Sequence, residues 1–210
     1  MAELRLYDAP RPPSPRRVRI FLAEKGIEVP RVTVDLSTGE HFSAEYRAVN
    51  PESTVPTLVL EDGRTIADSH AICHYFEGTH PEPPLMGRDA YERALVVEWS
   101  RRIDLEGYQA AAMFLRNTHP GFVDRAIPGV REGFPQVPAL GDHAQRLLAR
   151  LLQRVDGQLE SRPFLLGEQF GYVDICLLVA IDFAKRMKPE LPAHVQRWYD
   201  AVSARPSASA

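Results

Sequence analysis

One stretch of the chain, STVPTLVLEDGRTIADSHAI at residues 53–72, places a proline, two short strands and an acid–hydroxyl pair close together. Pro56 stands at the mouth of a strand, where it can donate no backbone hydrogen bond. Asp68 and Ser69 then open a helix whose following residues are largely apolar. A helix N-terminus attracts carboxylates, because it presents unpaired N–H groups and the positive end of the helix dipole. Asp and Ser are also common helix caps. The two interpretations are compatible, since a capped N-terminus still presents its N–H groups.

A histidine–cysteine cluster follows this pair. His70, Cys73 and His74 fall within one helical turn, which could suggest a zinc site. Zinc normally needs four ligands in known spacing, and the sequence has no second Cys/His cluster to supply them. We therefore expect no metal site. Cys73 and Cys176 are interpreted as small core residues.

Composition narrows the class of protein. The chain has 210 residues, enough for one large domain or two small ones, and a formal net charge of −3. Slight acidity argues against a nucleic-acid surface, which normally carries a basic stripe. The N-terminus has no signal pattern, and the longest apolar run, residues 175–181, is too short to cross a bilayer. We expect a soluble, cytoplasmic protein that binds neither nucleic acid nor membranes.

The first eighty residues alternate between strand and helix patterns. Gly26 is a natural stop for the first helix, and Val18, Phe21, Leu22 and Lys25 recur at helical spacing within it. The predicted strands are 3–7, 29–36, 57–60 and 65–67, and the predicted helices are 14–26, 43–50 and 68–77. The expected order is therefore β-α-β-α-β-β-α.

The remainder of the chain is predicted to be helical. A proline-rich stretch, THPEPPLMG, is predicted to be an extended linker between domains. Apolar residues then recur every three or four positions, as in a helix bundle, over 89–117, 140–160, 172–187 and 192–204. A long Pro/Gly-rich loop over 118–142 interrupts the bundle, and such loops are usually functional or mobile. We expect one domain over 1–80, a linker over 81–88 and a second domain over 89–210.

Five motifs occur in an order typical of one family. They are RRVRIFLAEKGI (16–27), NPESTVPTLVLEDGRTIADSHAI (50–72), PEPPLMG (81–87), FLLGEQFGYVDI (164–175) and RWYDAVSARPS (197–207). With the order of elements, they resemble cytosolic glutathione transferases over nearly the whole chain, and a bacterial and fungal branch in the PRRVRIFLAEKG pattern. The resemblance implies an α/β plus all-α fold, with an N-terminal thioredoxin-like domain followed by an all-helical domain.

The resemblance also implies a cradle for glutathione. A cis Val55–Pro56 bond would turn the N–H and C=O of Val55 outward to pair with the cysteinyl backbone, as an added strand does. Ser69 would bind the γ-glutamyl carboxylate and Asp68 its ammonium, although many members have the longer Glu before the serine. His41 lies where the family usually places a donor for the glycyl carboxylate. The alternative for His41 is a solvated loop histidine.

The group that stabilises the thiolate is less defined. Ser14 could donate to the sulfur, as could N–H groups beginning the first helix, but Ser followed by Pro is also a good N-cap and N1 pair. Arg16 and Arg17 could supply positive potential near the sulfur or be solvated. In this family the end of the first long helix of the second domain lines the cleft opposite the cradle. Tyr108, Asn117 and His119 could face that cleft, or His119 could be an ordinary C-terminal residue favoured by the helix dipole. Bound water is a further candidate for stabilising the thiolate.

The resemblance leads to one main function and two alternatives. The main expectation is a homodimeric glutathione S-transferase that activates glutathione to attack small hydrophobic electrophiles, with the loop from Thr118 to Asp142 forming their pocket. A related alternative is glutathione-dependent disulfide reduction. A third is a non-catalytic interaction module, although such modules tend to lose the acid–serine pair that this chain retains.

Overall fold

The computed structural model describes residues 3–210 and forms two compact units. The first runs to Pro83 and includes residues 128–130 and 210, and the second consists of residues 84–127 and 131–209. Within the described residues, no helix is long and apolar enough to cross a membrane. The same part of the chain contains no group of three His, Cys, Asp or Glu side chains that could hold a metal ion.

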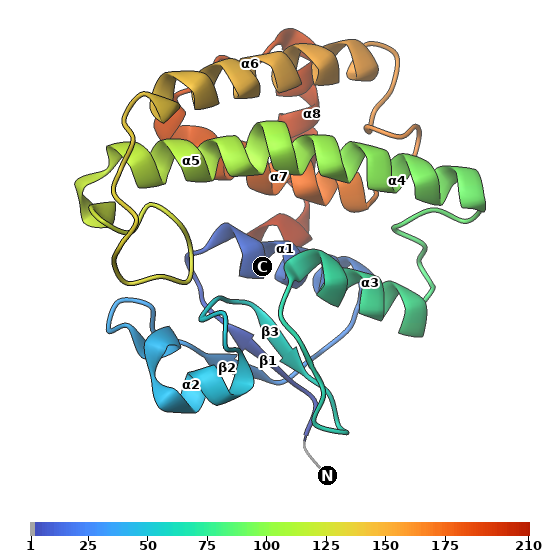
Figure 1. Ribbon diagram of the computed structural model, residues 1–210. Coiled ribbons are helices and arrows are strands. Elements are labelled where there is room, and N and C mark those ends of the chain that lie inside the picture. Colours follow the sequence, from blue (N-terminus) through green and yellow to red (C-terminus); the bar gives the residue numbers. More distant parts are fainter. Residues whose placement is uncertain (1–2) are drawn as a thin grey trace. The chain divides into compact units, whose positions relative to one another are not determined.

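The first unit is built on a four-stranded sheet with the order β2-β1-β3-β4. The strands are β1 (Arg5–Asp8), β2 (Arg31–Thr33), β3 (Thr57–Val59) and β4 (Thr65–Ile66), and the helices are α1 (Pro13–Lys25), α2 (Ala44–Val49) and α3 (Ser69–Thr79). β1 pairs parallel to β2 and antiparallel to β3, which pairs antiparallel to β4. Figure 1 shows α1 and α3 on one side of this sheet and α2 on the other. The thioredoxin-like fold is thereby confirmed.

Helix α1 differs from its prediction at one end. It stops at Lys25, and Gly26 closes it in the left-handed conformation (φ 64°), as the sequence indicated. It begins at Pro13 with Pro12 as its N-cap residue, so the prediction that Ser14 caps the helix is wrong. Proline is favoured in the first turn, where its fixed φ suits a helix and its missing N–H costs nothing. Pro13, the second of two consecutive prolines, therefore starts the helix ahead of Ser14.

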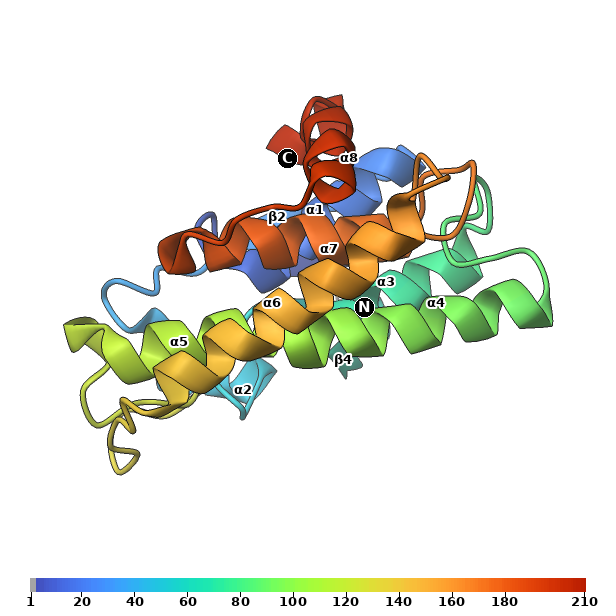
Figure 2. The ribbon, with the colours of Figure 1, turned by 90° about the horizontal axis from the view of Figure 1, so that it is seen from above.

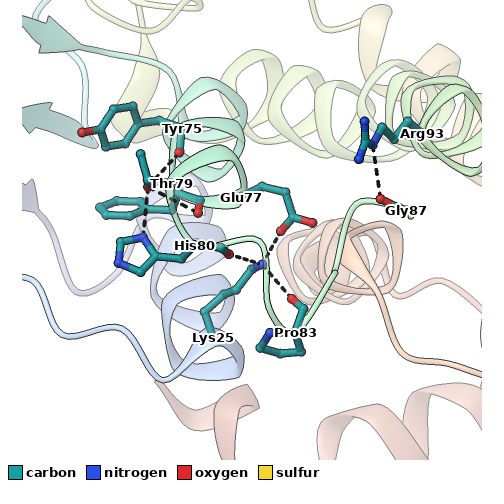
Figure 3. A network of polar contacts seen from close by, with 9 residues as sticks. Lys25, Tyr75, Glu77, Thr79, His80, Pro83, Gly87 and Arg93 are labelled. Carbon is teal, nitrogen blue, oxygen red and sulfur yellow. Dashed lines mark hydrogen bonds and ion pairs between the residues drawn. The ribbon is translucent and has the colours of Figure 1, made fainter. Parts of the chain in front are cut away.

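Helices α1 and α3 pack against each other through fully buried apolar side chains, among them Phe21 and Ile72. At their C-terminal ends, the Lys25 side chain is fully buried and its Nζ lies 2.6 Å from Glu77 Oε2. It also donates to the carbonyls of His80 and Pro83, each at 2.7 Å (Figure 3). The buried ammonium therefore has two hydrogen-bond acceptors and one ion-pair partner at this end of the helix pair.

The second unit is an all-helical bundle, as predicted. Its helices are α4 (Ala90–Ile103), α5 (Gln109–Thr118), α6 (Leu140–Leu159), α7 (Tyr172–Phe183) and α8 (Ala193–Ser203). In Figures 1 and 2, α4 and α5 follow one another in a single rod, with α6 beside α5. A π-helical turn, Asp104–Tyr108, separates α4 from α5, where the sequence predicted one uninterrupted helix.

This turn brings a glycine against two other helices. A Cβ added to Gly107 would lie 2.8 Å from Leu151 Cδ2 on α6 and 3.3 Å from Ala180 Cβ on α7. The backbone therefore approaches both helices more closely than a side chain would allow. An apolar periodicity cannot register one extra residue in a turn, which explains why the sequence missed it.

Helix α7 forms the centre of this bundle, and its first turn encloses the buried carboxylate of Asp174. Asp174 accepts hydrogen bonds from the backbone N–H of Gly171, from that of Leu165 and from Trp198 Nε1. The bond to Gly171 caps the N-terminus of α7. Burial raises the pKa of Asp174 to about 6, against the effect of these three donors.

Candidate active site

The loop before β3 is held rigid by two residues of α2 and its end. Asn50 is buried, and its Nδ2 donates to the Thr54 carbonyl at 2.8 Å and to Thr57 Oγ1 at 3.1 Å. The hydroxyl of Tyr46 donates to the same Thr54 carbonyl. Burial also raises the pKa of Tyr46. The peptide next to Val55 therefore has a fixed position.

The Val55–Pro56 peptide bond is cis, as the family resemblance implied. Pro56 is buried, whereas Val55 is half-buried. Neither the N–H nor the C=O of Val55 hydrogen-bonds to any residue in the described range 3–210. A backbone N–H and C=O without partners in the protein can pair with an added strand, so this pair has the capacity to bind an extended peptide from outside.

The start of α3 places Asp68 and Ser69 side by side with different environments. Asp68 is exposed and caps the helix, since its Oδ1 accepts from the N–H groups of His70 and Ala71 at 2.9 and 3.0 Å. Its Oδ2 has no hydrogen-bond partner among the described residues. Capping therefore uses one carboxylate oxygen and leaves the other for a cation, so the two interpretations of Asp68 are compatible in this geometry.

Ser69 is 2% exposed, and its Oγ accepts a hydrogen bond from Arg17 Nη1 at 2.8 Å. Arg17 lies on α1 and is itself 2% exposed, so of the two alternatives for Arg17 the solvated one is wrong. The backbone N–H of Ser69 makes no hydrogen bond within residues 3–210. An N–H and a hydroxyl of one residue thus meet at a helix N-terminus next to a guanidinium, which favours a negative ligand.

His41 lies in a 3₁₀ turn, Glu40–Phe42, directly before α2. It is half-buried, and its ring lies 3.9 Å from that of Phe42, centroid to centroid. The ring of Phe42 covers part of the His41 side chain, and a half-buried position fits both a loop histidine and a ligand donor. Its contact with a ligand carboxylate stays a prediction.

Ser14 occupies the second position of α1 and is half-buried. The neighbouring positions Pro12, Pro13 and Pro15 have no backbone N–H. Among residues 12–15, Ser14 therefore supplies the one backbone N–H as well as a hydroxyl. The two candidate donors at this helix start, hydroxyl and backbone, belong to a single residue.

In the second unit, the polar residues at the end of α5 hold the following loop. Asn117 is buried; its Nδ2 donates to the Met113 carbonyl and its Oδ1 accepts from Val137 N–H. His119 caps the next turn by accepting from Gly121 N–H at 3.1 Å. Both side chains therefore have structural partners in this unit.

The same loop exposes apolar side chains, and two arginines, Arg116 of α5 and Arg125 of the loop, lie beside one of its aromatic rings. Val123 is 63% exposed and Phe134 45%. The guanidinium carbons of Arg116 and Arg125 lie 4.8 and 5.5 Å from the centre of the Phe122 ring. Neither arginine forms an ion pair within residues 3–210. Burial, and then Arg125, lower the pKa of Arg116.

Comparison with known proteins decides the family. The description "Glutathione S-transferase, N-terminal domain" matches residues 13–79, and "Glutathione S-transferase, C-terminal domain" matches residues 110–206. "Glutathione S-transferase 2" of Saccharomyces cerevisiae is 30% identical over 207 residues, covering 96% of this chain and 86% of that protein. The chain belongs to the glutathione S-transferase family. Glutathione is the co-substrate of this family of transferases.

Other members of the family show the same relation. The crystal structure of a glutathione S-transferase domain-containing protein from Marinobacter aquaeolei VT8 has a TM-score of 0.87 and 32% identity, covering 97% of this chain and 98% of that one. "Maleylacetoacetate isomerase" of Rattus norvegicus is 31% identical over 179 residues, covering 83% of this chain and 75% of that protein. Both a transferase and an isomerase are thus named among the relatives.

Three residues that support the site were missed or left open by the sequence. Asn50 and Tyr46 fix the loop before Val55, and Arg17 contacts Ser69 across a helix pair. Asn50 ends a helix and precedes a proline, so its pattern indicated only a boundary. Nothing in local spacing distinguishes the buried Arg17 from a solvated arginine, because its partner lies 52 residues away.

Proposed function

We propose that this chain is a glutathione transferase whose first unit binds glutathione at Val55, Asp68, Ser69 and His41. The observation that carries the proposal is the set of backbone groups without partners in the described chain: the N–H and C=O of Val55 and the N–H of Ser69. The first pair suits the cysteinyl backbone of glutathione, as an added strand would. The second suits a carboxylate at a helix N-terminus.

The γ-glutamyl end of glutathione carries an ammonium beside a carboxylate. In the proposed complex, Ser69 receives the carboxylate and Oδ2 of Asp68 receives the ammonium. Because Oδ1 alone caps α3, binding requires no loss of the cap. His41 would donate to the glycyl carboxylate at the other end of the tripeptide.

Conjugation requires a thiolate, since a thiol is a poor nucleophile at neutral pH. We propose that Ser14 stabilises it, through its hydroxyl, its backbone N–H or both. Hydrogen bonds to an anion lower the pKa of its conjugate acid. Bound glutathione should therefore be a thiolate at a pH where the free peptide is a thiol.

The electrophile is proposed to be small and apolar, in keeping with the exposed apolar side chains of the loop after α5. A second candidate is glutathione-dependent isomerisation of a carboxylate-bearing substrate. It is favoured by the two arginines around Phe122, which lack ion pairs in the described chain, and by the isomerase among the relatives.

The ultraviolet absorbance of the thiolate, measured on protein-bound glutathione against pH, tests binding and activation together. We expect a thiol pKa well below the free value of about 8.5. Ser14→Ala removes the hydroxyl but keeps the backbone N–H. A partial return of the thiol pKa toward the free value would therefore give the share of the shift that comes from the hydroxyl. Binding without any shift would favour a non-catalytic interaction module.

Turnover of an aryl halide, a mixed disulfide and maleylacetoacetate by the same preparation separates conjugation, disulfide reduction and isomerisation. We expect the aryl halide to be conjugated at the highest kcat/KM. Homodimerisation and a cytoplasmic location follow from the family as proposals. Sedimentation of the purified chain at assay concentration measures the first, and fractionation of the source cells the second.

A further inference from the structure

Arg17 and Ser69 form a buried contact between the N-terminal ends of two helices. Arg17 is in the second turn of α1 and Ser69 is the first residue of α3. Both residues are 2% exposed, and the Nη1–Oγ distance is 2.8 Å. A capping role does not explain the contact, because Asp68 already caps α3.

The direction of this hydrogen bond constrains the serine proton. A guanidinium has donors and no acceptor, so the Ser69 oxygen must accept from Arg17. The Ser69 hydroxyl proton therefore points away from Arg17 and is free to donate elsewhere. The backbone N–H of the same residue has no partner within residues 3–210. Ser69 thus offers two donors to a group that only accepts, and an ionised carboxylate is such a group.

The charge of Arg17 acts in the same direction. Water is nearly excluded from its guanidinium, and charges in such surroundings interact more strongly than at the surface. The dipole of α3 is positive at the same end. An anion hydrogen-bonded to Ser69 therefore experiences both fields.

We infer that Arg17 is a positioning residue for the γ-glutamyl carboxylate: it orients the Ser69 hydroxyl and makes the site select peptides that carry this carboxylate. The inference rests on the proposed binding of glutathione. It goes beyond it in naming the residue, acting through Ser69, that sets the preference for one group of the tripeptide.

The experiment compares two peptides by isothermal titration calorimetry on the full chain. One is glutathione, and the other is 4-aminobutanoyl-cysteinyl-glycine, which lacks only the carboxylate in question. The variant Arg17→Met removes the guanidinium and keeps the length of the side chain. Lys25→Met is the matched control, because it removes another buried cation from the same helix, about 12 Å further along by helix rise.

We expect the wild-type chain to prefer glutathione, and Arg17→Met to weaken glutathione binding about 10- to 100-fold, the range of a charge-assisted hydrogen bond. Binding of the truncated peptide should change about 2-fold at most, because sites without shared partners act independently. Lys25→Met should leave the ratio of the two affinities unchanged.

Several results would overturn the inference. If Arg17→Met lost affinity equally for glutathione and for the truncated peptide, Arg17 would have only a structural role. If neither affinity changed, Arg17 would not act on the site. A wild-type chain that binds neither peptide would contradict the proposed function itself. Should Arg17→Met fail to fold, Arg17→Lys keeps the charge but not the planar fork. The ratio of the affinities for glutathione and the truncated peptide should then be lower in Arg17→Lys than in the wild type. A ratio equal to that of the wild type would contradict the positioning role.

Discussion

At each end of the α1–α3 helix pair, a buried cation of α1 contacts a side chain of α3, but the two contacts differ in the donors that they leave available. Arg17 meets Ser69 at the N-terminal end, which we name the cradle end, and Lys25 meets Glu77 at the C-terminal end, the lysine end. Each pair is separated by 52 residues in sequence. The helices therefore run parallel, and a cation of α1 touches α3 at both places.

The two ends differ in whether hydrogen-bond donors stay available for a ligand. At the lysine end, Nζ donates to two carbonyls and forms an ion pair with the Glu77 carboxylate (Figure 3). At the cradle end, the contact with a neutral hydroxyl leaves that hydroxyl's proton and the Ser69 N–H available. A closed network stabilises the fold, whereas a network with donors left over can bind a ligand.

The largest effect on stability is expected at the lysine end. Lys25→Met leaves Glu77 and two carbonyls without their cation, and breaking a buried ion pair on one side costs about 3–5 kcal/mol. The free energy of unfolding in urea measures this loss. Adding Glu77→Gln should recover part of it, since the negative charge that faced Lys25 is then removed as well. A loss below about 1 kcal/mol, as for an exposed pair, would mean that the lysine end is not closed.

A buried charge of the second unit extends the comparison to pH. The folded-state pKa of Asp174 is raised from 3.8 to about 6, so the folded chain binds the proton more tightly than the unfolded chain. Its contribution to stability is present below pH 3.8 and is lost as the pH rises through 6.

Asp174→Asn removes this titration. From pH 4 to pH 7, the unfolding free energy of the wild type should fall relative to that of the variant by up to about 3 kcal/mol, at 1.4 kcal/mol per pKa unit. Urea unfolding of both proteins across this range measures the difference. A difference that rises with pH would contradict the assigned direction.

At the cradle end, the loop before Val55 should affect both stability and binding. Asn50→Ala leaves the Thr54 carbonyl with fewer donors, which should cost about 1–3 kcal/mol. Glutathione affinity should fall about 10-fold, because a displaced Val55 needs to lose only about 1.4 kcal/mol of binding free energy for that change. Asp62→Ala, in an exposed turn of the same unit, is the control and should leave affinity unchanged. Calorimetry gives the affinities.

The smallest effect on stability is expected at Asp68. Asp68→Asn keeps an oxygen that can cap α3, so its unfolding free energy should stay within about 0.5 kcal/mol of the wild type. Asp68→Ala should lose about 1 kcal/mol, as for other caps. Both should weaken glutathione binding, since both remove the negative charge. If Asp68→Asn bound glutathione with wild-type affinity, capping would be the whole role of this residue.

The sequence was informative where a local pattern has a local cause. Gly26 ends α1 because a left-handed residue is needed there, and the cis Val55–Pro56 bond followed from the family motif. Lys25 was placed on the apolar stripe of its helix, where it is buried. The start of α1 was misplaced because successive prolines suit several registers.

The sequence could not supply contacts between distant residues. Whether Arg17 is solvated or buried depends on α3, and the bonds that fix Thr54 depend on the path of the chain after α2. Such partners are set by tertiary packing and leave no trace in spacing. The open groups at Val55 and Ser69 are of the same kind, because a donor is unpaired only relative to a whole structure.

The central claim is that the cradle end binds glutathione and the lysine end does not. Nitrogen-15 heteronuclear NMR during a glutathione titration observes both ends in one experiment. The account predicts that the amide resonances of Val55 and Ser69 shift the most and saturate together, while those of Thr79 and His80 stay in place. Shifts that spare Val55 and Ser69, or that centre on the lysine end, would contradict it.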